Sequence, residues 1–523
     1  MTDVLTPVYD PVHPSRGALA TVLFPLVQAM PAAAAQDPAP RVEDVTELQG
    51  LSARWTAALE TLEVPGFAVA VVKDGAVLAL DAFGVRNAAG EPATPDTCYY
   101  IASATKPFTA MAVCLLAGEG KLELDASLKD VLPEFVLPSE DLTVALTLRD
   151  LLCHRHGLEC GPIVHRDAYT GQITDEIYFR LLQDAEIANY VRYSNIHFTL
   201  AGRAIEAASG MKWQDFLDQR LFEPAGMMRT TAYASEMYGK FEHAEPMLRI
   251  EGKWHRSPLV KTDRTMHAAG GMGTTARDAA RWLILNLNGG EIDGRRILPE
   301  TMEEEYYSKN SDLPVPQGSI WMEEGFALGW CVGKYREPTR PYFFHGGGYV
   351  GAASYICFLP EHGIGVAALA NSDGGAAMAT IVTIDVLDRL LGVTGQPDLL
   401  PNYEESTRQW RAQGPSVPAG GVNPARAPDG LSRPPETYAG TYSDPILGEL
   451  EIFLDARGGL AARAGDLSYV LVSEGTDEFT AIVVPGMVER GRFEVSSDGT
   501  VEAVSFADGE SATRLLRTAT KAR

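Results

Sequence analysis

Ser103 and Lys106 are spaced so that one side chain could activate the other. Residues 103–106 read Ser-Ala-Thr-Lys, and positions three apart lie on one face of a helical turn, so the lysine amine can reach the serine hydroxyl. A serine becomes a nucleophile only when a base takes its proton. A lysine can be that base when burial without an acidic partner lowers its pKa. The spacing therefore predicts acyl-transfer chemistry at Ser103.

The Ser-x-x-Lys pattern is weak evidence alone, because about one copy is expected by chance in a chain this long. A second copy runs from Ser209 to Lys212, but there the serine ends a helical pattern and Gly210 follows it as a helix cap. Ser103 instead follows a short apolar strand at 99–101 and precedes a helical pattern at 108–116. We therefore expect Ser103 to be the reactive serine.

Two further motifs supply groups that acyl transfer needs. In Tyr193-Ser194-Asn195, the tyrosine could relay a proton, and Asn195 could hold both the lysine and a substrate carbonyl. His345 precedes three glycines and is expected to end a strand. Gly347 and Gly348 would let a substrate approach the backbone, and a following N–H could stabilise an oxyanion.

Other motifs do not support a different chemistry. Gly346-x-Gly348-x-x-Gly351 matches the dinucleotide fingerprint, but a strand and hairpin follow where that motif needs a helix. The chain has no Gly-x-Ser-x-Gly elbow. His154-x-His156 lacks a third metal ligand at a recognisable spacing, so we favour a structural role for it. The sequence therefore predicts neither a metal nor a cofactor.

Composition limits the class of protein and its partners. A chain of 523 residues is expected to form two or more domains. Its formal net charge of -25 argues against nucleic acid and anionic membranes and favours a small-molecule or peptide partner. The six cysteines are scattered without a Cys-x-x-Cys pair. We favour buried free thiols over a disulfide between Cys153 and Cys160.

The N-terminus has features of a bacterial secretory signal. An apolar stretch at 18–30 follows Arg16 and runs into Ala33-x-Ala35, which resembles a signal-peptidase site. Acidic Asp3 and Asp10 fit this poorly, and a disordered tail is the alternative. We expect residues 1–35 to be the signal and the protein to be periplasmic or secreted, with a cytoplasmic location as the alternative. No later apolar run is long enough to span a membrane.

The elements that must position these residues follow an α+β pattern. A helix is expected at 45–62, and a hairpin at 67–83 turns at Asp74-Gly75. The middle of the chain has helical patterns, and strands return late, before a last helix at 376–391. The expected helices of the middle are 146–152, 176–182, 198–208 and 213–222, and the expected late strands are 327–333, 342–345, 354–359 and 364–370. This predicts an antiparallel sheet flanked by helices, with an all-helical subdomain.

A second domain is expected at the C-terminus. Residues 395–433 are rich in Pro, Gly, Ser and charge, which is typical of a linker. Closely spaced short strands with turn signals follow from 448 to 517 and predict a small antiparallel β-barrel or sandwich. The expected domains are the signal, a catalytic domain at 36–394, the linker, and a β domain at 434–523.

The three motifs, in this order and spacing, resemble the serine β-lactamase and penicillin-binding superfamily. The likeness is greatest to the class C β-lactamase-related branch, with its D-aminopeptidases, family VIII esterases and related peptidases. The resemblance covers about residues 46–391 and is supported by the sequence segments at 147–158, 222–227, 268–282 and 345–360. The final segment is similar to the lipocalin-like β domain that often accompanies such hydrolases.

The resemblance implies a role for each site residue. Ser103 would be acylated, and Lys106 and Tyr193 would share the general-base and general-acid work, with the first base left open. Asn195 would orient Lys106 and the substrate, and the N–H groups of Ser103 and Gly348 would form the oxyanion hole. No metal or cofactor is implied.

The resemblance also suggests a substrate class. His345 stands where β-lactamases carry a lysine for the antibiotic's carboxylate, and a mostly neutral imidazole offers less. We therefore expect a peptidase or amidase acting on small or linear peptides, including peptides with D-residues. A family VIII-type carboxylesterase with weak β-lactamase activity is one alternative, and a non-catalytic binding or scaffold protein is another. A homo-oligomer is left open.

Overall fold

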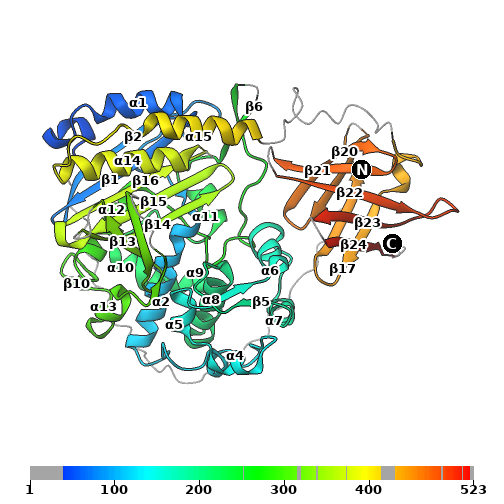
Figure 1. Ribbon diagram of the computed structural model, residues 1–523, viewed down its shortest axis with the longest axis horizontal. Helices are drawn as coiled ribbons and strands as arrows, with labels where there is room; N and C mark the ends of the chain where they lie inside the picture. Colours follow the sequence, from blue (N-terminus) through cyan, green and yellow to red (C-terminus); the bar gives the residue numbers. More distant parts are fainter. Residues whose placement is uncertain are drawn as a thin grey trace, which may run out of the picture. The chain divides into compact units, whose positions relative to one another are not determined.

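The computed structural model describes residues 39–250, 252–314, 320–336, 340–372, 374–413, 430–456, 458–484, 487–508 and 511–518 (Figure 1). The expected signal at 1–35 lies outside these ranges, as do residues 414–429 of the expected linker. Among the described helices, none combines the length and the apolar character that a bilayer span requires.

Eight strands form the central sheet, and every neighbouring pair in it is antiparallel. In sheet order they are β11 (Ser311–Asp312), β12 (Trp321–Phe326), β13 (Cys331–Tyr335), β14 (Pro341–Tyr349), β15 (Ala352–Leu359), β16 (Ile364–Ala370), β1 (Gly66–Lys73) and β2 (Ala76–Gly84). The early hairpin β1–β2 joins the late strands through β1 and β16, where Phe67 lies opposite Ala370. The expected antiparallel sheet, assembled from both ends of the domain, is confirmed.

Strand β1 is buried on both faces because its alternating side chains enter two different cores. Phe67, Val69 and Val71 pack with α1 (Leu51–Thr61) and α14 (Gly375–Leu390) on one face. Ala68 and Ala70 belong to the larger core on the other face, where α12 (Ala276–Leu287) packs against β1 and β16. Figure 1 shows α14 and α12 on opposite sides of this sheet.

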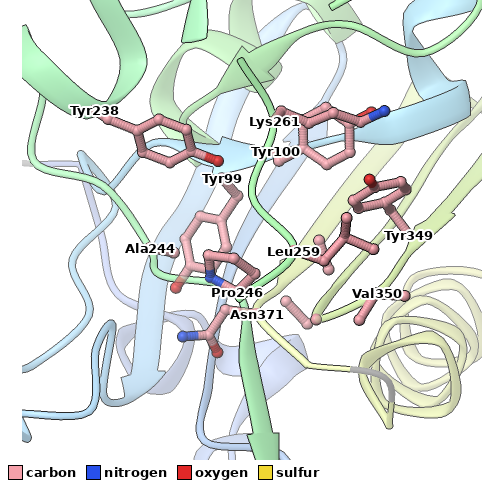
Figure 2. Close-up of a pocket in the computed structure, with 13 residues that line it drawn as sticks. Tyr99, Tyr100, Tyr238, Ala244, Pro246, Leu259, Lys261, Tyr349, Val350 and Asn371 are labelled. Atoms are coloured by element: carbon pink, nitrogen blue, oxygen red, sulfur yellow. The ribbon is translucent and has the colours of Figure 1, made fainter. Parts of the chain in front are cut away.

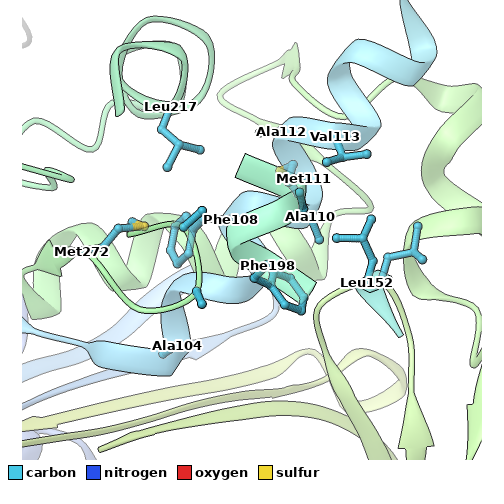
Figure 3. Packing of buried hydrophobic residues seen from close by; sticks show 14 of the residues in the cluster. Ala104, Phe108, Ala110, Met111, Ala112, Val113, Leu152, Phe198, Leu217 and Met272 are labelled. Carbon is cyan, nitrogen blue, oxygen red and sulfur yellow. The ribbon is translucent and has the colours of Figure 1, made fainter. Parts of the chain in front are cut away.

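Helix α2 (Lys106–Gly118) runs through the larger core. Its residues 106–116 are all buried, as expected for a helix that is apolar around its whole circumference. Figure 3 shows Phe108 and Met111 of α2 close to Phe198, which belongs to α8 (Asn195–Ser209). Pro107 lies in the first turn of α2, where its missing N–H costs no helical hydrogen bond.

The remaining helices and paired strands of this domain are short. The helices are α3 (Leu128–Val131), α4 (Glu140–Ala145), α5 (Leu148–Leu152), α6 (Gly161–His165), α7 (Asp175–Leu182), α9 (Trp213–Leu217), α10 (Glu223–Ala225), α11 (Ala234–Lys240) and α13 (Glu300–Tyr307). The two-stranded sheets pair β3 (Tyr99–Tyr100) with β8 (Gly273–Thr274), β4 (Gly157–Glu159) with β5 (Glu186–Ala188), β6 (Met247–Ile250) with β7 (Lys253–Arg256), and β9 (Glu291–Ile292) with β10 (Arg295–Arg296).

Several expected boundaries are wrong, and three of them have a clear local reason. The helix expected at 45–62 begins only at Leu51, because Gly50 adopts a left-handed φ of 85° after two short 3₁₀ turns. The strand expected at 327–333 begins at Cys331, since the Ala327 N–H donates to the Trp330 carbonyl in a turn. The strand expected to end at His345 continues through the glycines to Tyr349, where it pairs with β15.

The C-terminal strands close into a barrel. They are β17 (Gly440–Asp444), β18 (Gly448–Leu454), β19 (Leu460–Ala464), β20 (Leu467–Gly475), β21 (Glu478–Val484), β22 (Met487–Val495), β23 (Val501–Asp508) and β24 (Ser511–Arg517). The first strand, β17, pairs with the last, β24, through Tyr442 and Arg517. This pairing closes the sheet, so the expected barrel is confirmed over the alternative sandwich. Part of the expected linker is instead a helix, α15 (Leu400–Gln413). The sequence did not indicate this helix, because few of its residues are apolar.

All six cysteines are buried and free. The expectation of buried thiols is confirmed, and the alternative disulfide between Cys153 and Cys160 is absent.

Candidate active site

Ser103 lies between the end of strand β3 and the start of helix α2, as the sequence predicts. A 3₁₀ turn at Ala102–Thr105 connects the two, and Ala102 has a left-handed φ of 47°, which is strained for a residue with a Cβ. The turn is held from outside, because the Ser354 hydroxyl of β15 donates to the Ile101 carbonyl at 2.8 Å. Backbone strain maintained by its surroundings is common at functional sites.

The amine of Lys106 is fully buried and contacts three oxygen atoms. Its Nζ lies 3.2 Å from Ser103 Oγ, 2.8 Å from Asn195 Oδ1 and 2.6 Å from the Ala269 carbonyl oxygen. All three partners are neutral. Desolvation without a compensating carboxylate holds the pKa of Lys106 well below 10.5.

These contacts suit a neutral amine. A neutral amine has two N–H donors and one lone pair, whereas a carbonyl oxygen can only accept. In the neutral amine the Asn195 and Ala269 oxygens can take both donors, and the lone pair then faces the Ser103 hydroxyl, whereas the protonated amine donates to all three oxygens. The arrangement can remove a proton from that hydroxyl.

Tyr193 lies beside both groups. Its ring centroid is 4.6 Å from Lys106 Nζ, and the Ser103 side chain is near enough to affect the pKa of its hydroxyl. The residue is 39% exposed, but its hydroxyl is at the buried end, where desolvation raises its pKa against the lowering effect of Ser103. The phenol can therefore hold a proton and donate it to a group at Ser103.

Asn195 is positioned by a helix start. Ser194 caps α8, because its hydroxyl accepts the Ile196 N–H at 3.2 Å. Asn195 is then the first residue of α8, and its side chain reaches Lys106 of α2. Two helices that contact each other thus fix the Lys106–Asn195 pair.

His345 faces the site from β14 and is uncharged. Its ring centroid lies 6.1 Å from that of Tyr193, and its Nδ1 is 2.7 Å from the Gly346 carbonyl. Since the carbonyl only accepts, Nδ1 carries the proton and Nε2 is the free acceptor. Burial, with Lys106 nearby, lowers the pKa of His345 to about 3.

Gly347 and Gly348, which follow His345 in β14, differ in the space around them. A Cβ at Gly347 would lie 1.9 Å from the Ile101 carbonyl and 2.4 Å from Ser354 Oγ, so only glycine lets β14 approach the Ser103 turn. A Cβ at Gly348 would meet nothing within 4 Å, and the residue is exposed. Gly347 therefore serves packing, and Gly348 borders open space.

Ser209, which the sequence set aside, and the buried Lys261 are both occupied elsewhere. Ser209 is the last residue of α8 and Gly210 caps it with a φ of 70°, as expected. Lys261 donates to the Ala168 carbonyl at 2.6 Å, and its amine lies 4.2 Å from the Tyr349 ring centroid. Figure 2 shows Lys261 beside Tyr100 in the neighbouring cavity. Neither residue belongs to the candidate site.

The structural role favoured for His154 is supported by its contacts. Its Nδ1 lies 2.8 Å from Nδ1 of His197, and both rings are buried. Within the described ranges, no three His, Cys, Asp or Glu side chains are arranged to hold a metal ion.

Sequence reasoning missed the Ala269 carbonyl and the His197 ring. The first carries no side-chain signal, because any residue provides a carbonyl oxygen. The second, His197, lies among buried apolar residues of α8, where the sequence gives no sign of a polar contact. Only the positions of α2, α8 and the loop before β8 reveal both contacts.

The chain is similar in sequence to known proteins. The model of the beta-lactamase family matches residues 51–390. Penicillin-binding protein 4 of Amycolatopsis lactamdurans is 27% identical over 356 residues, which cover 65% of this chain and 91% of the relative. Unguisins hydrolase ungD' of Aspergillus campestris is 26% identical over 427 residues, 77% of each chain.

A solved structure shares the fold over a longer span. The octameric penicillin-binding protein homologue from Pyrococcus abyssi matches with a TM-score of 0.56 and 21% identity, over 89% of this chain and 99% of that one. At this identity the match reports the fold alone.

Proposed function

Since the chain belongs to the beta-lactamase family, a family of serine hydrolases, we propose that it hydrolyses amide bonds through an acyl-enzyme on Ser103. The observation that carries the proposal is the buried amine of Lys106, which lies 3.2 Å from Ser103 Oγ and has only neutral oxygens as partners. A buried amine with only neutral partners is the condition under which lysine acts as a base.

In the acylation step, Lys106 takes the hydroxyl proton while Oγ of Ser103 forms a bond to the substrate's carbonyl carbon. The tetrahedral intermediate then expels the amine, which leaves with a proton donated by Tyr193, and the Lys106 ammonium returns a proton to the phenolate. The raised pKa of Tyr193 and the lowered pKa of Lys106 support this division of roles.

Deacylation repeats the sequence with water. Water gives a proton to the basic group and bonds to the acyl carbon, the carbon–Oγ bond breaks, and Oγ recovers its proton. The N–H groups of Ser103 and Gly348 are proposed to hold the oxyanion in both steps. The open space at Gly348 supports this, because a substrate carbonyl can reach that backbone.

The substrate class follows from charge. His345 is neutral, so it offers little attraction to the carboxylate of a β-lactam. The net charge of -25 also disfavours anionic substrates. We therefore propose small or linear peptides and amides, including those with D-residues, as substrates. A carboxylesterase would use the same acyl-enzyme and is the second candidate.

The test compares an ester and an amide that share one acyl group with peptides and with a β-lactam. The purified protein is given a p-nitrophenyl ester, the matched p-nitroanilide, linear peptides of L- and D-residues, and nitrocefin. We expect hydrolysis of anilide and peptide with nitrocefin the poorest substrate. Ester cleavage without any amide cleavage would identify an esterase, and a preference for nitrocefin would contradict the proposed role of His345.

Two expectations about the whole chain stay predictions. The apolar stretch at 18–30 predicts export, which mass spectrometry of the mature N-terminus would reveal. A homo-oligomer is also proposed, with the octameric homologue of the same fold as support. Light scattering of the purified protein would give its mass relative to the 56.5 kDa chain.

A further inference from the structure

We propose that His154 is a positioning residue that fixes Tyr193 at the active site. The proposal rests on the function proposed above, in which Tyr193 protonates the leaving group. The backbone N–H of Arg192 donates to the His154 carbonyl at 3.1 Å, and the N–H of Ser194 donates to His154 Nδ1 at 3.3 Å. One residue thus holds the chain on both sides of Tyr193.

The His154 ring also touches the phenol that it brackets. The two ring centroids lie 4.6 Å apart, and the rings of Phe326 and His154 pack in a T-shaped arrangement with centroids 4.9 Å apart. His154 is 2% exposed, whereas Tyr193 is 39% exposed. The buried His154 ring therefore restrains the partly exposed Tyr193 side chain, which could otherwise change its rotamer.

The hydrogen bonds determine where the protons of the histidine pair lie. Because the Ser194 N–H donates to His154 Nδ1, that atom is an acceptor, so His197 Nδ1 carries the proton of the 2.8 Å contact. The Leu158 N–H donates to His197 Nε2 at 3.4 Å, so His197 has no second proton. His197 is neutral, and its Nδ1–H and the Ser194 N–H share the single lone pair of His154 Nδ1 in a three-centre contact that orients the His154 ring.

The backbone of His154 is strained in a way that this role explains. Its φ is 56°, in the left-handed region that residues other than glycine seldom occupy. This conformation lets the carbonyl and the ring of one residue both bind residues 192–194. Strain of this kind persists only where the surroundings maintain it, and it is concentrated at functional sites.

The test uses two kinds of leaving group, because p-nitrophenolate departs without a proton, whereas an alkyl alcohol or amine must gain one. His154→Ala is compared with wild type on the p-nitrophenyl ester, the ethyl ester and the alkyl amide of one acyl group. Loss of a positioned general acid costs on the order of 100-fold. We expect a loss of about that size in kcat on the ethyl ester and amide, with little change in KM or in p-nitrophenyl ester turnover.

His154→Asn is the matched rescue variant. Its Oδ1 replaces Nδ1 as an acceptor for two hydrogen bonds, and asparagine tolerates a positive φ. We expect it to retain most of the activity on the poor leaving groups. If the alanine variant does not fold, His154→Gly, which removes the ring and relieves the backbone strain, takes its place.

Tyr193→Phe separates a failure of this inference from a failure of the proposed function. If Tyr193→Phe shows the selective loss but the His154 variants lower all substrates equally, His154 is only structural and the inference is wrong. If Tyr193→Phe itself shows no selectivity, the proposed role of Tyr193 is wrong. Equal activity of His154→Ala and wild type on every substrate would also overturn the inference.

Discussion

Lys106 Nζ lies 3.2 Å from Ser103 Oγ, one helical turn along the chain, and two neutral oxygens from distant segments take its other hydrogen bonds. The pair is thus local in sequence, but the state of the amine is set by α8 and by the loop that carries Ala269.

Activity should rise with pH and level off well below 10.5, the ordinary lysine pKa. A base works only when it is unprotonated, and a lowered pKa makes Lys106 unprotonated at a lower pH. The measurement is kcat/KM for a neutral ester as a function of pH. A profile that keeps rising up to 10.5 would show that Lys106 is an ordinary charged lysine.

The free energy of unfolding should depend on pH in a way that reflects the lowered pKa of Lys106. Between the lowered pKa of folded Lys106 and 10.5, the unfolded chain binds one more proton than the folded chain, so this group makes stability increase with pH. Relative to Lys106→Met, wild type should gain up to about 1.4 kcal/mol in the free energy of unfolding per pH unit. Urea titrations of both proteins at two pH values measure this, and a constant difference would refute the lowered pKa.

His345→Asn should lower activity by the same factor at about pH 5.5 and about pH 7.5, on either side of the usual histidine pKa. The reason is that His345, with a pKa near 3, stays neutral across this interval. Initial rates with one neutral ester give the factor at each pH. A factor that changes with a midpoint near the usual value would mean that His345 is protonated during turnover.

Gly347→Ala and Gly348→Ala form a matched pair. The first places a Cβ against the Ile101 carbonyl and should destabilise the fold by about 1–3 kcal/mol and displace the Ser103 turn. The second enters open space and should change stability by less than about 0.5 kcal/mol. Thermal melts and ester turnover check both. Equal effects of the two changes would contradict the packing described for β14.

The sequence was sufficient for the fold class because its periodic signals were strong. The run at Ile364–Ala370 is apolar throughout, and its boundaries match those of β16. The turn at Asp74-Gly75 was predicted from its residue types, and both residues adopt a positive φ. Strands with weak signals were missed or misplaced: β17 was not expected, and the continuation of β14 through three glycines depends on its partner β15.

The site was predictable where chemistry requires side chains at fixed spacing. Ser103, Lys106, Tyr193, Asn195 and His345 were all identified from the sequence, and the structure brings them together. Contacts that any residue could supply were not predictable. The Ala269 carbonyl and the left-handed conformation of Ala102 have no signature in residue type.

The most direct test of the account is covalent labelling by a fluorophosphonate, read out by mass spectrometry of the digested protein. Wild type and Ser209→Ala, which removes the serine of the other Ser-x-x-Lys sequence, should both carry the label on Ser103, and Ser103→Ala should carry none. A folded wild-type protein that stays unlabelled, or one labelled on a different serine, would contradict the account and favour a binding protein or another nucleophile.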